Sequence, residues 1–267
     1  MRKKMLIALL SVLGVYASVC GLACVSYRTL LYPAPGGVAA GPGDHLVEMT
    51  TSDGVKAHAY DYTEPGDASV LVWFHGNGET AENSIDLAGV FRARGIGSVF
   101  AEYRGYGASR ASGKPNEQGL YADAAAVLDA LEKKGFDPKK IVLVGYSLGT
   151  GVASEMAIRK RGRALVLISP FTSIPAVAGR HAPFLPTSLL VGDKFDTLSK
   201  AARIDVPTTV IHGTDDGVVP FDMGERVAKA IPHATFIPIV GGGHADLFAT
   251  AYDRLIGAVV SITSLPM

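Results

Sequence analysis

Gly145-Tyr146-Ser147-Leu148-Gly149 is the stretch from which the fold of this chain can be worked out. It follows Ile141-Val142-Leu143-Val144, an apolar β-branched run with the length of a buried strand, and it precedes a helical pattern over residues 150–161. A serine between a strand and a helix stands on a tight turn that needs small neighbours, which the two glycines provide. The helix start also directs backbone N–H groups toward the space in front of the Ser147 hydroxyl. The pattern predicts a strand, a strained turn and a helix, with the serine exposed at the turn.

Apolar strands and amphipathic helices alternate along the rest of the chain. The strands are predicted at residues 69–74, 96–101, 141–144, 164–169, 208–212 and 235–240, and the helices at residues 83–94, 117–134, 150–161, 223–230 and 247–262. The dipeptide Asp53-Gly54 between two alternating segments, 47–51 and 55–63, predicts an antiparallel hairpin before the first buried strand. This alternation indicates an α/β fold with a mostly parallel sheet covered by helices on both faces.

Several polar residues come directly after these predicted strands. They are Ser147, Asp216, His244 and the loop His75-Gly76-Asn77. Open parallel sheets bind ligands beyond the carboxyl ends of their strands, so we expect these residues to meet at one edge. A serine hydroxyl needs a base to become a nucleophile, and the base needs an acid that orients it. We therefore predict Ser147 as nucleophile, Asp216 as acid and His244 as base.

Other histidines and another aspartate could in principle serve as the base and the acid. His244 follows three glycines, which give an exposed loop suited to carrying an imidazole, whereas His75 and His212 each precede a glycine at a strand end. We expect those two histidines to hold neighbouring loops by hydrogen bonds. Asp215 adjoins Asp216 and only one of the two can face His244, so Asp215 is expected to stabilise the loop instead.

Two backbone N–H groups are the predicted oxyanion hole. One belongs to Leu148, directly after the nucleophile, and the other to Asn77, in the loop that follows the strand at 69–74. Gly76 and Gly78 let that loop backbone come close to a ligand. A glycine-rich loop can also bind phosphate, but no Lys-Ser/Thr follows this one, which argues against a nucleotide loop.

The N-terminus carries an uninterrupted apolar segment. Arg2-Lys3-Lys4 precedes residues 5–27, which contain no charge and exceed the about 20 residues that a helix needs to cross a bilayer. The basic flank predicts a cytoplasmic N-terminus and an extracytoplasmic body. A retained anchor is the favoured hypothesis. The alternatives are a signal cleaved near Ala17 or Ala23, and lipid attachment at Cys24, whose preceding residues loosely resemble a lipoprotein processing site.

Charge and cysteine content exclude several classes of protein. Lys+Arg and Asp+Glu are both 25, so the formal net charge is zero and gives no electrostatic argument for nucleic-acid binding. Both cysteines, Cys20 and Cys24, lie in the N-terminal segment, so the remaining chain offers no disulfide and no thiolate metal site. No metal and no organic cofactor is expected.

Taken together, these motifs resemble the α/β-hydrolase superfamily, and more narrowly its membrane-tethered, small-lid α/β-hydrolase-domain proteins, which are grouped with serine aminopeptidases. The matching segments are His75-Gly76-Asn77-Gly78, Tyr103-Arg104-Gly105-Tyr106-Gly107, Gly145-Tyr146-Ser147-Leu148-Gly149, His212-Gly213-Thr214-Asp215-Asp216 with Val219-Pro220, and Gly242-Gly243-His244. The resemblance covers roughly residues 45–262, and the combination is specific for the superfamily. One departure is Glu102, where an Asp commonly precedes Tyr-Arg-Gly.

The resemblance implies an eight-stranded sheet and a serine hydrolase that works through an acyl-enzyme, with Ser147, Asp216 and His244 as its triad. Expected substrates are small-molecule or lipid acyl esters and thioesters. A serine aminopeptidase-like peptidase and a non-catalytic binding protein on the same fold are the alternatives. The expected organisation is an anchor at 1–27, a linker at 28–44 and a hydrolase domain at 45–264.

A short lid is expected at about residues 171–200, where prolines interrupt an apolar stretch. A lid of this size suggests an open site. Two interpretations of its large apolar side chains stay open: they line an acyl pocket, or they simply pack the lid onto the sheet. The residues concerned are Phe171, Phe184, Leu185, Leu189 and Leu190.

Overall fold

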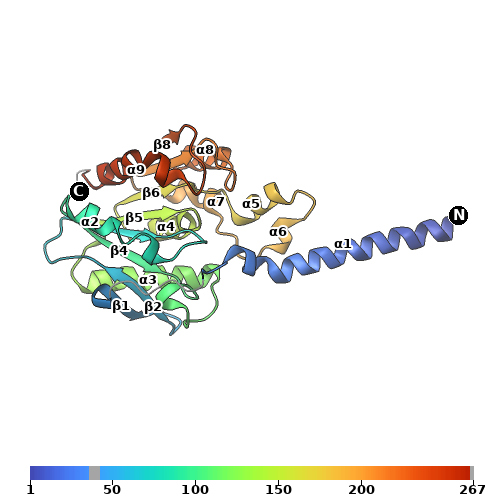
Figure 1. The fold of residues 1–267 in the computed structure, drawn as a ribbon, viewed down its shortest axis with the longest axis horizontal. Coiled ribbons are helices and arrows are strands. Elements are labelled where there is room, and N and C mark those ends of the chain that lie inside the picture. The colour runs from blue at the N-terminus through green and yellow to red at the C-terminus, as the bar shows by residue number, and fades with distance from the viewer. Residues whose placement is uncertain (36–42, 265–267) are drawn as a thin grey trace.

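A single mixed sheet organises the computed structural model, which describes residues 1–35 and 43–264 of the chain. Within these residues eight strands are hydrogen-bonded in the order β1-β2-β4-β3-β5-β6-β7-β8 (Figure 1). The strand β2 pairs antiparallel with both β1 and β4, and every other neighbouring pair is parallel. The predicted eight-stranded, mostly parallel sheet and its opening hairpin are therefore confirmed.

The strands follow the apolar runs of the sequence closely. They are β1 (Leu46–Thr50), β2 (Lys56–Asp61), β3 (Ser69–Phe74), β4 (Ile96–Glu102), β5 (Ile141–Tyr146), β6 (Ala164–Ile168), β7 (Thr208–Gly213) and β8 (Ala234–Ile239). Every residue of β3, β4, β5 and β6 is buried. Helices cover both faces of these central strands, which is why their sequences are mostly apolar and do not alternate with polar residues.

Two layers of helices enclose the sheet. The helices α3 (Glu117–Lys133), α4 (Leu148–Ile158) and α8 (Phe221–Ala230) pack on one face, and α2 (Leu87–Arg92) and α9 (Leu247–Thr263) on the other. Successive residues of β3 point to opposite layers: Val72 contacts the first core and Trp73 the second. The sheet thus separates two apolar cores and leaves its strand ends free to carry polar groups.

Two of the predicted helices differ most from the structure. The helix predicted at residues 150–161 begins at Leu148, so the motif serine stands at the N-cap position of α4, without a capping hydrogen bond from its side chain. The helix predicted at 83–94 is confined to α2, because Thr80 and Asn83 close a separate short turn by capping each other. The first shift matters for the site, since it brings the start of α4 to the serine.

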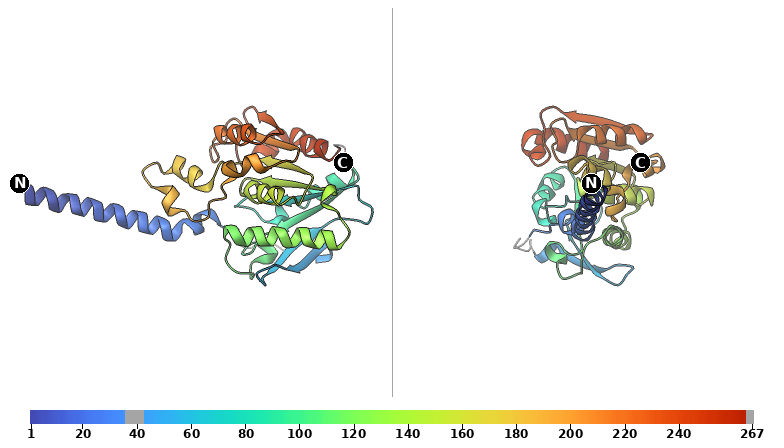
Figure 2. Two further views of the ribbon diagram at one scale, coloured as in Figure 1. Left: turned by 180° about the vertical axis from the view of Figure 1, so that it is seen from behind. Right: turned by 90° about the vertical axis from the view of Figure 1, so that its right-hand side faces the viewer.

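The apolar N-terminal segment forms the long helix α1 (Arg2–Leu31), which projects away from the sheet (Figures 1 and 2). It continues past Tyr27 to Leu31, has no buried residue, and is long and apolar enough to cross a membrane. The segment predicted as a linker therefore starts as helix, and its residues 36–42 lie outside the described residues. The lid segment lies beside the end of α1 and contains three short helices: α5 (Ile174–His181), α6 (Thr187–Leu190) and α7 (Thr197–Lys200).

Candidate active site

Ser147 stands on a strained turn between β5 and α4. Its backbone has φ 49 and ψ −115, a conformation that costs about 1–3 kcal/mol and persists only where the surroundings enforce it. The glycines on either side allow the close packing that does so. A Cβ on Gly149 would lie 2.0 Å from the carbonyl oxygen of Phe74, and a Cβ on Gly145 would lie 2.4 Å from that of Gly149. The turn therefore needs both glycines of the motif.

The structure brings together the three side chains that the sequence singles out. The Ser147 Oγ lies 2.9 Å from Nε2 of His244, and Nδ1 of His244 lies 2.7 Å from Oδ2 of Asp216. An ionised carboxylate only accepts hydrogen bonds, so Nδ1 carries the proton and Nε2 presents its lone pair to the hydroxyl. This is the arrangement in which the imidazole can take a proton from Ser147.

Asp216 is held by more than the histidine. Its side chain is fully buried, and Oδ1 accepts hydrogen bonds from the backbone N–H groups of Val218 at 2.9 Å and Val219 at 2.7 Å. Burial raises the pKa of Asp216, but hydrogen bonds from His212 and His244 and the attraction of His244 outweigh it and hold the pKa well below its ordinary value. Asp216 is thus a fixed anion. Asp215 is exposed and accepts from the hydroxyl of Thr214 instead.

The two other strand-end histidines hold loops, as expected from their positions. His212 Nε2 donates to the carbonyl of Val219 at 3.0 Å and lies 3.3 Å from Oδ2 of Asp216. His75 bonds the carbonyl of Gly76 at 2.7 Å and a carboxylate oxygen of Glu102 at 2.9 Å. Burial lowers the pKa of His75, yet the bond with Glu102 raises it overall. Glu102, the departure from the family pattern, therefore pairs with His75 beneath the loop that carries Asn77.

Tyr146 is a part of this site that the sequence analysis missed. Its hydroxyl donates a hydrogen bond to the carbonyl of His244 at 2.8 Å, and the two rings are stacked with centroids 5.6 Å apart. The tyrosine fills a variable position of the motif, and its partner is remote in the chain. No local pattern could have indicated the contact. Tyr146 fixes the glycine-rich loop on which the imidazole stands.

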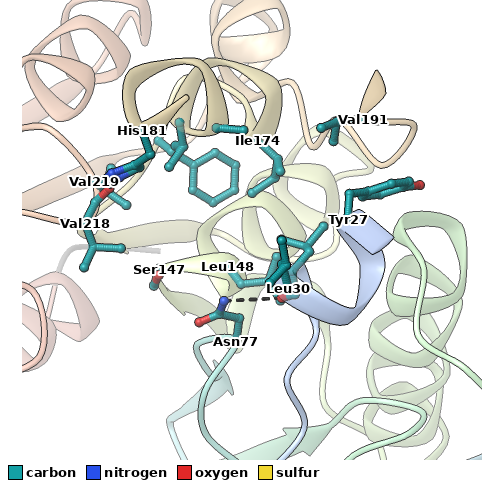
Figure 3. A pocket seen from close by; sticks show the side chains of 14 residues that line it. Tyr27, Leu30, Asn77, Ser147, Leu148, Ile174, His181, Val191, Val218 and Val219 are labelled. Carbon is teal, nitrogen blue, oxygen red and sulfur yellow. Dashed lines mark hydrogen bonds between the residues drawn. The ribbon is translucent and has the colours of Figure 1, made fainter. Parts of the chain in front are cut away.

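The residues of the two predicted oxyanion donors line the same cavity as the serine. Leu148 opens α4, so its N–H has no carbonyl partner within its own helix. Asn77 follows β3, and its side chain turns away to donate to the carbonyl of Leu31 at 3.3 Å (Figure 3). Leu148, Asn77 and Ser147 all line one cavity of about 300 Å³. Backbone donors beside a nucleophile are what stabilises a negatively charged oxygen in acyl transfer.

The cavity in front of Ser147 is mostly apolar. Its walls come from the lid, from the loop after β7 and from the end of α1 (Figure 3); they include Tyr27, Leu30, Leu31, Phe171, Ile174, Val177, Val191, Val218 and Val219. Among the described residues, no carboxylate and no cluster suited to a metal ion borders it. Such a cavity fits an apolar group next to the reacting atoms.

Only one of the five lid residues considered above lines this cavity, namely Phe171. Phe184 is 66% exposed and Leu189 is 82% exposed, so these two neither form the pocket nor pack onto the sheet. Neither of the two interpretations of the lid therefore describes them. They belong to the part of the lid that contacts α1, here called the lid tip: Tyr16 of α1 donates a hydrogen bond to the carbonyl of Phe184, and Leu189 lies in α6, which contacts α1.

Comparison with known proteins agrees with this fold. The strand order, the serine turn and the strand-end polar groups define an α/β-hydrolase fold. A family model described as "Serine aminopeptidase, S33" matches residues 67–195. An uncharacterised protein of Mycobacterium tuberculosis is 33% identical over 82% of this chain and 80% of its own length. The human alpha/beta hydrolase domain-containing protein 17C is 34% identical over 72% of this chain, which spans 58% of that protein. The chain therefore belongs to the α/β-hydrolase superfamily.

Solved structures show the same architecture at low sequence identity. The esterase Pf2001 of Pyrococcus furiosus has a TM-score of 0.66 and 20% identity, over 86% of this chain and 98% of its own. The esterase RhEst1 of Rhodococcus sp. ECU1013 has a TM-score of 0.64 and 19% identity, over 82% of this chain and 98% of its own. Likeness at this identity establishes the fold, while activity has to be argued from the site.

Proposed function

We propose that the protein is a serine hydrolase that cleaves carboxylic ester or thioester acyl bonds through an acyl-enzyme. The observation that carries the proposal is the continuous hydrogen-bond chain from Ser147 through His244 to the buried Asp216, at the mouth of an apolar cavity. A serine buried for structural reasons alone would need neither a strained backbone nor a base with its lone pair toward the hydroxyl.

The proposed reaction proceeds in two halves. Ser147 Oγ attacks the acyl carbon while His244 Nε2 takes the hydroxyl proton, and Asp216 stabilises the imidazolium that results. The N–H groups of Leu148 and Asn77 stabilise the oxyanion. His244 then gives the proton to the leaving oxygen or sulfur, and the acyl group stays on Ser147. Water then attacks the acyl carbon while His244 takes its proton, and His244 returns a proton to Ser147 Oγ as the acid leaves. No metal or organic cofactor takes part.

A peptidase is the second candidate, because the matching family model is described as a serine aminopeptidase. An aminopeptidase needs an acidic group that holds the free amine of its substrate. No Asp or Glu is among the described residues that line the cavity, and most of its lining is apolar. This lining favours an acyl chain over an amino terminus, so we rank the esterase or thioesterase first.

A fluorophosphonate probe tests the proposal directly, since it labels only an activated serine. We expect labelling of the full chain and its loss in Ser147→Ala. Hydrolysis of p-nitrophenyl acyl esters, compared with aminoacyl p-nitroanilides, then separates esterase from aminopeptidase. Folded wild-type protein that neither labels nor hydrolyses either substrate would refute catalysis and favour a binding protein on a hydrolase fold.

We also propose that α1 is a retained single-pass anchor, with a hydrolase domain at residues 45–264 on the extracytoplasmic side. Tyr16 donates a hydrogen bond to the lid carbonyl of Phe184 at 2.9 Å, and each of the cleavage alternatives would remove Tyr16. The mass of the protein isolated from membranes tests this. A retained anchor gives the full chain of 27.9 kDa, whereas a lipoprotein would begin at a lipidated Cys24.

A further inference from the structure

The end of the N-terminal helix forms part of the catalytic cavity. Tyr27, Leu30 and Leu31, in the last turns of α1, line the same cavity as Ser147 (Figure 3). A helix that served only as a tether would have no reason to contact the catalytic cavity. Here residues of the last turns of the apolar helix line the pocket themselves (Figure 3).

A buried carboxylate holds this end of α1 in place. Asp193, in the segment between α6 and α7, accepts hydrogen bonds from Arg28 Nε at 2.8 Å and from the Tyr27 hydroxyl at 3.2 Å. Its other oxygen lies 3.3 Å from Arg28 Nη2 and also accepts the backbone N–H of Glu117, which opens α3, at 3.2 Å. Asp193 therefore ties α1 to the lid and to the domain at once. Tyr27, Arg28 and Asp193 together hold the end of α1 in position.

The end of α1 also contacts the loop that carries a proposed oxyanion donor. The carbonyl of Leu31 accepts a hydrogen bond from the Asn77 side chain at 3.3 Å, and the next residue, Tyr32, is buried in the main core. The position of α1 and the shape of the pocket beside Ser147 are thus coupled through direct contacts.

The surroundings of α1 indicate where the pocket obtains its ligand. The helix has 30 residues, which is about 45 Å at 1.5 Å per residue, and none of them is buried. Phe184 and Leu189 on the neighbouring lid tip are exposed and apolar as well. A lipid bilayer is the environment that would cover a continuous apolar helix of this length together with such a tip. The pocket then lies directly beside hydrocarbon chains.

We propose that the last turns of α1 are a specificity-determining wall of the catalytic pocket, against which the acyl chain of a membrane-borne ester lies. Tyr27, Leu30 and Leu31 form this wall, and Asp193 is the positioning residue that holds it. The proposal rests on the proposed hydrolase function and adds its substrate class. A short acyl group reacts at Ser147 without reaching α1, whereas a long acyl chain extends along it. Changes in the wall consequently alter the dependence on chain length.

The test uses the full chain in phospholipid nanodiscs, with p-nitrophenyl acetate and p-nitrophenyl dodecanoate as substrates. Leu30→Trp narrows the pocket with a side chain that stays largely outside the core, since Leu30 is 77% exposed. We expect the ratio of kcat/KM for dodecanoate to that for acetate to fall about tenfold or more, the scale on which apolar pockets discriminate chain length. Leu22→Trp is the matched control, because Leu22 is 70% exposed on α1 and does not border the cavity, and it should leave the ratio unchanged.

Asp193→Asn provides a second, independent variant. The amide keeps an oxygen for the N–H of Glu117 but loses the charge that binds Arg28, so the wall is released while the start of α3 stays capped. The same ratio should fall, with fluorophosphonate labelling retained. An unchanged ratio in a variant that still labels would overturn the inference and leave the hydrolase intact. Wild-type protein that does not label would instead refute the proposed function itself.

Discussion

Asp216→Asn is the substitution that examines the proposed mechanism most closely. The amide has nearly the shape of the carboxylate, and the structure determines how it must orient. The backbone N–H groups of Val218 and Val219 both donate to Oδ1, so the amide oxygen has to occupy that position. The NH₂ group is then forced to the position of Oδ2, which lies 2.7 Å from Nδ1 of His244.

The size of the expected loss of kcat follows from the position of the proton on His244. An NH₂ group donates, so Nδ1 must accept and the proton moves to Nε2, 2.9 Å from the Ser147 hydroxyl. The imidazole then presents a donor to the nucleophile and no longer acts as its base. In a serine protease triad this tautomer error lowers kcat by about 10⁴-fold. That is about 5 kcal/mol of transition-state stabilisation. The fold should survive, since His212 keeps the carbonyl of Val219 as its acceptor at 3.0 Å.

The assay is steady-state hydrolysis of p-nitrophenyl butyrate at neutral pH, with thermal unfolding as a check on folding. Asp215→Asn is the control, because the exposed Asp215 side chain accepts a hydrogen bond from its neighbour Thr214 and does not contact His244, and the kcat of this variant should match wild type. A folded Asp216→Asn protein that retained more than about a tenth of wild-type kcat would refute the assigned base and acid. So would a loss of activity in Asp215→Asn as large as that in Asp216→Asn.

Three further outcomes are expected. Tyr146→Phe keeps the ring against His244 but removes one hydrogen bond of about 0.5–1.5 kcal/mol, so kcat should fall by no more than about tenfold; a loss as complete as that of the nucleophile variant contradicts this positioning role. Gly149→Ala would place a Cβ 2.0 Å from a carbonyl oxygen, so fluorophosphonate labelling should disappear, whereas Gly257→Ala, with open space around it, should label normally. A hydrogen bond from Arg104 holds the pKa of the Asp53 carboxyl well below its ordinary value. An ionised carboxyl whose pKa is lower in the folded than in the unfolded state stabilises the fold above about pH 4, and this contribution is lost as the pH falls further. The melting temperatures of wild type and Asp53→Asn should therefore differ at neutral pH and converge in acid. A difference in melting temperature that stays constant with pH would refute the lowered pKa of Asp53.

The sequence predicted the sheet because burial on both faces leaves a direct trace in composition. The strands at 69–74, 96–102 and 141–146 are mostly apolar on both faces, and their ends are marked by glycine and polar residues. The motif around Ser147 could also be interpreted locally, because a tight turn restricts its own neighbours. Family resemblance then added the number of strands. The ends of the helices were predicted less accurately. Thr80 and Asn83 cap a separate short turn, so the helix begins later than the periodic pattern of apolar residues predicts.

By itself, then, the sequence determined the fold class, the serine turn and a short set of polar candidates at strand ends. Only the tertiary structure decided which atoms meet: Oδ2 of Asp216 on the imidazole, the Tyr146 hydroxyl on the His244 loop, and Asp193 on the end of α1. The physical reason is the range of the interactions. Periodicity and turn chemistry act between near neighbours in the chain, whereas a hydrogen bond between side chains from distant segments depends on how the sheet and helices pack. The contribution of α1 to the pocket wall likewise depends on how distant segments of the chain pack.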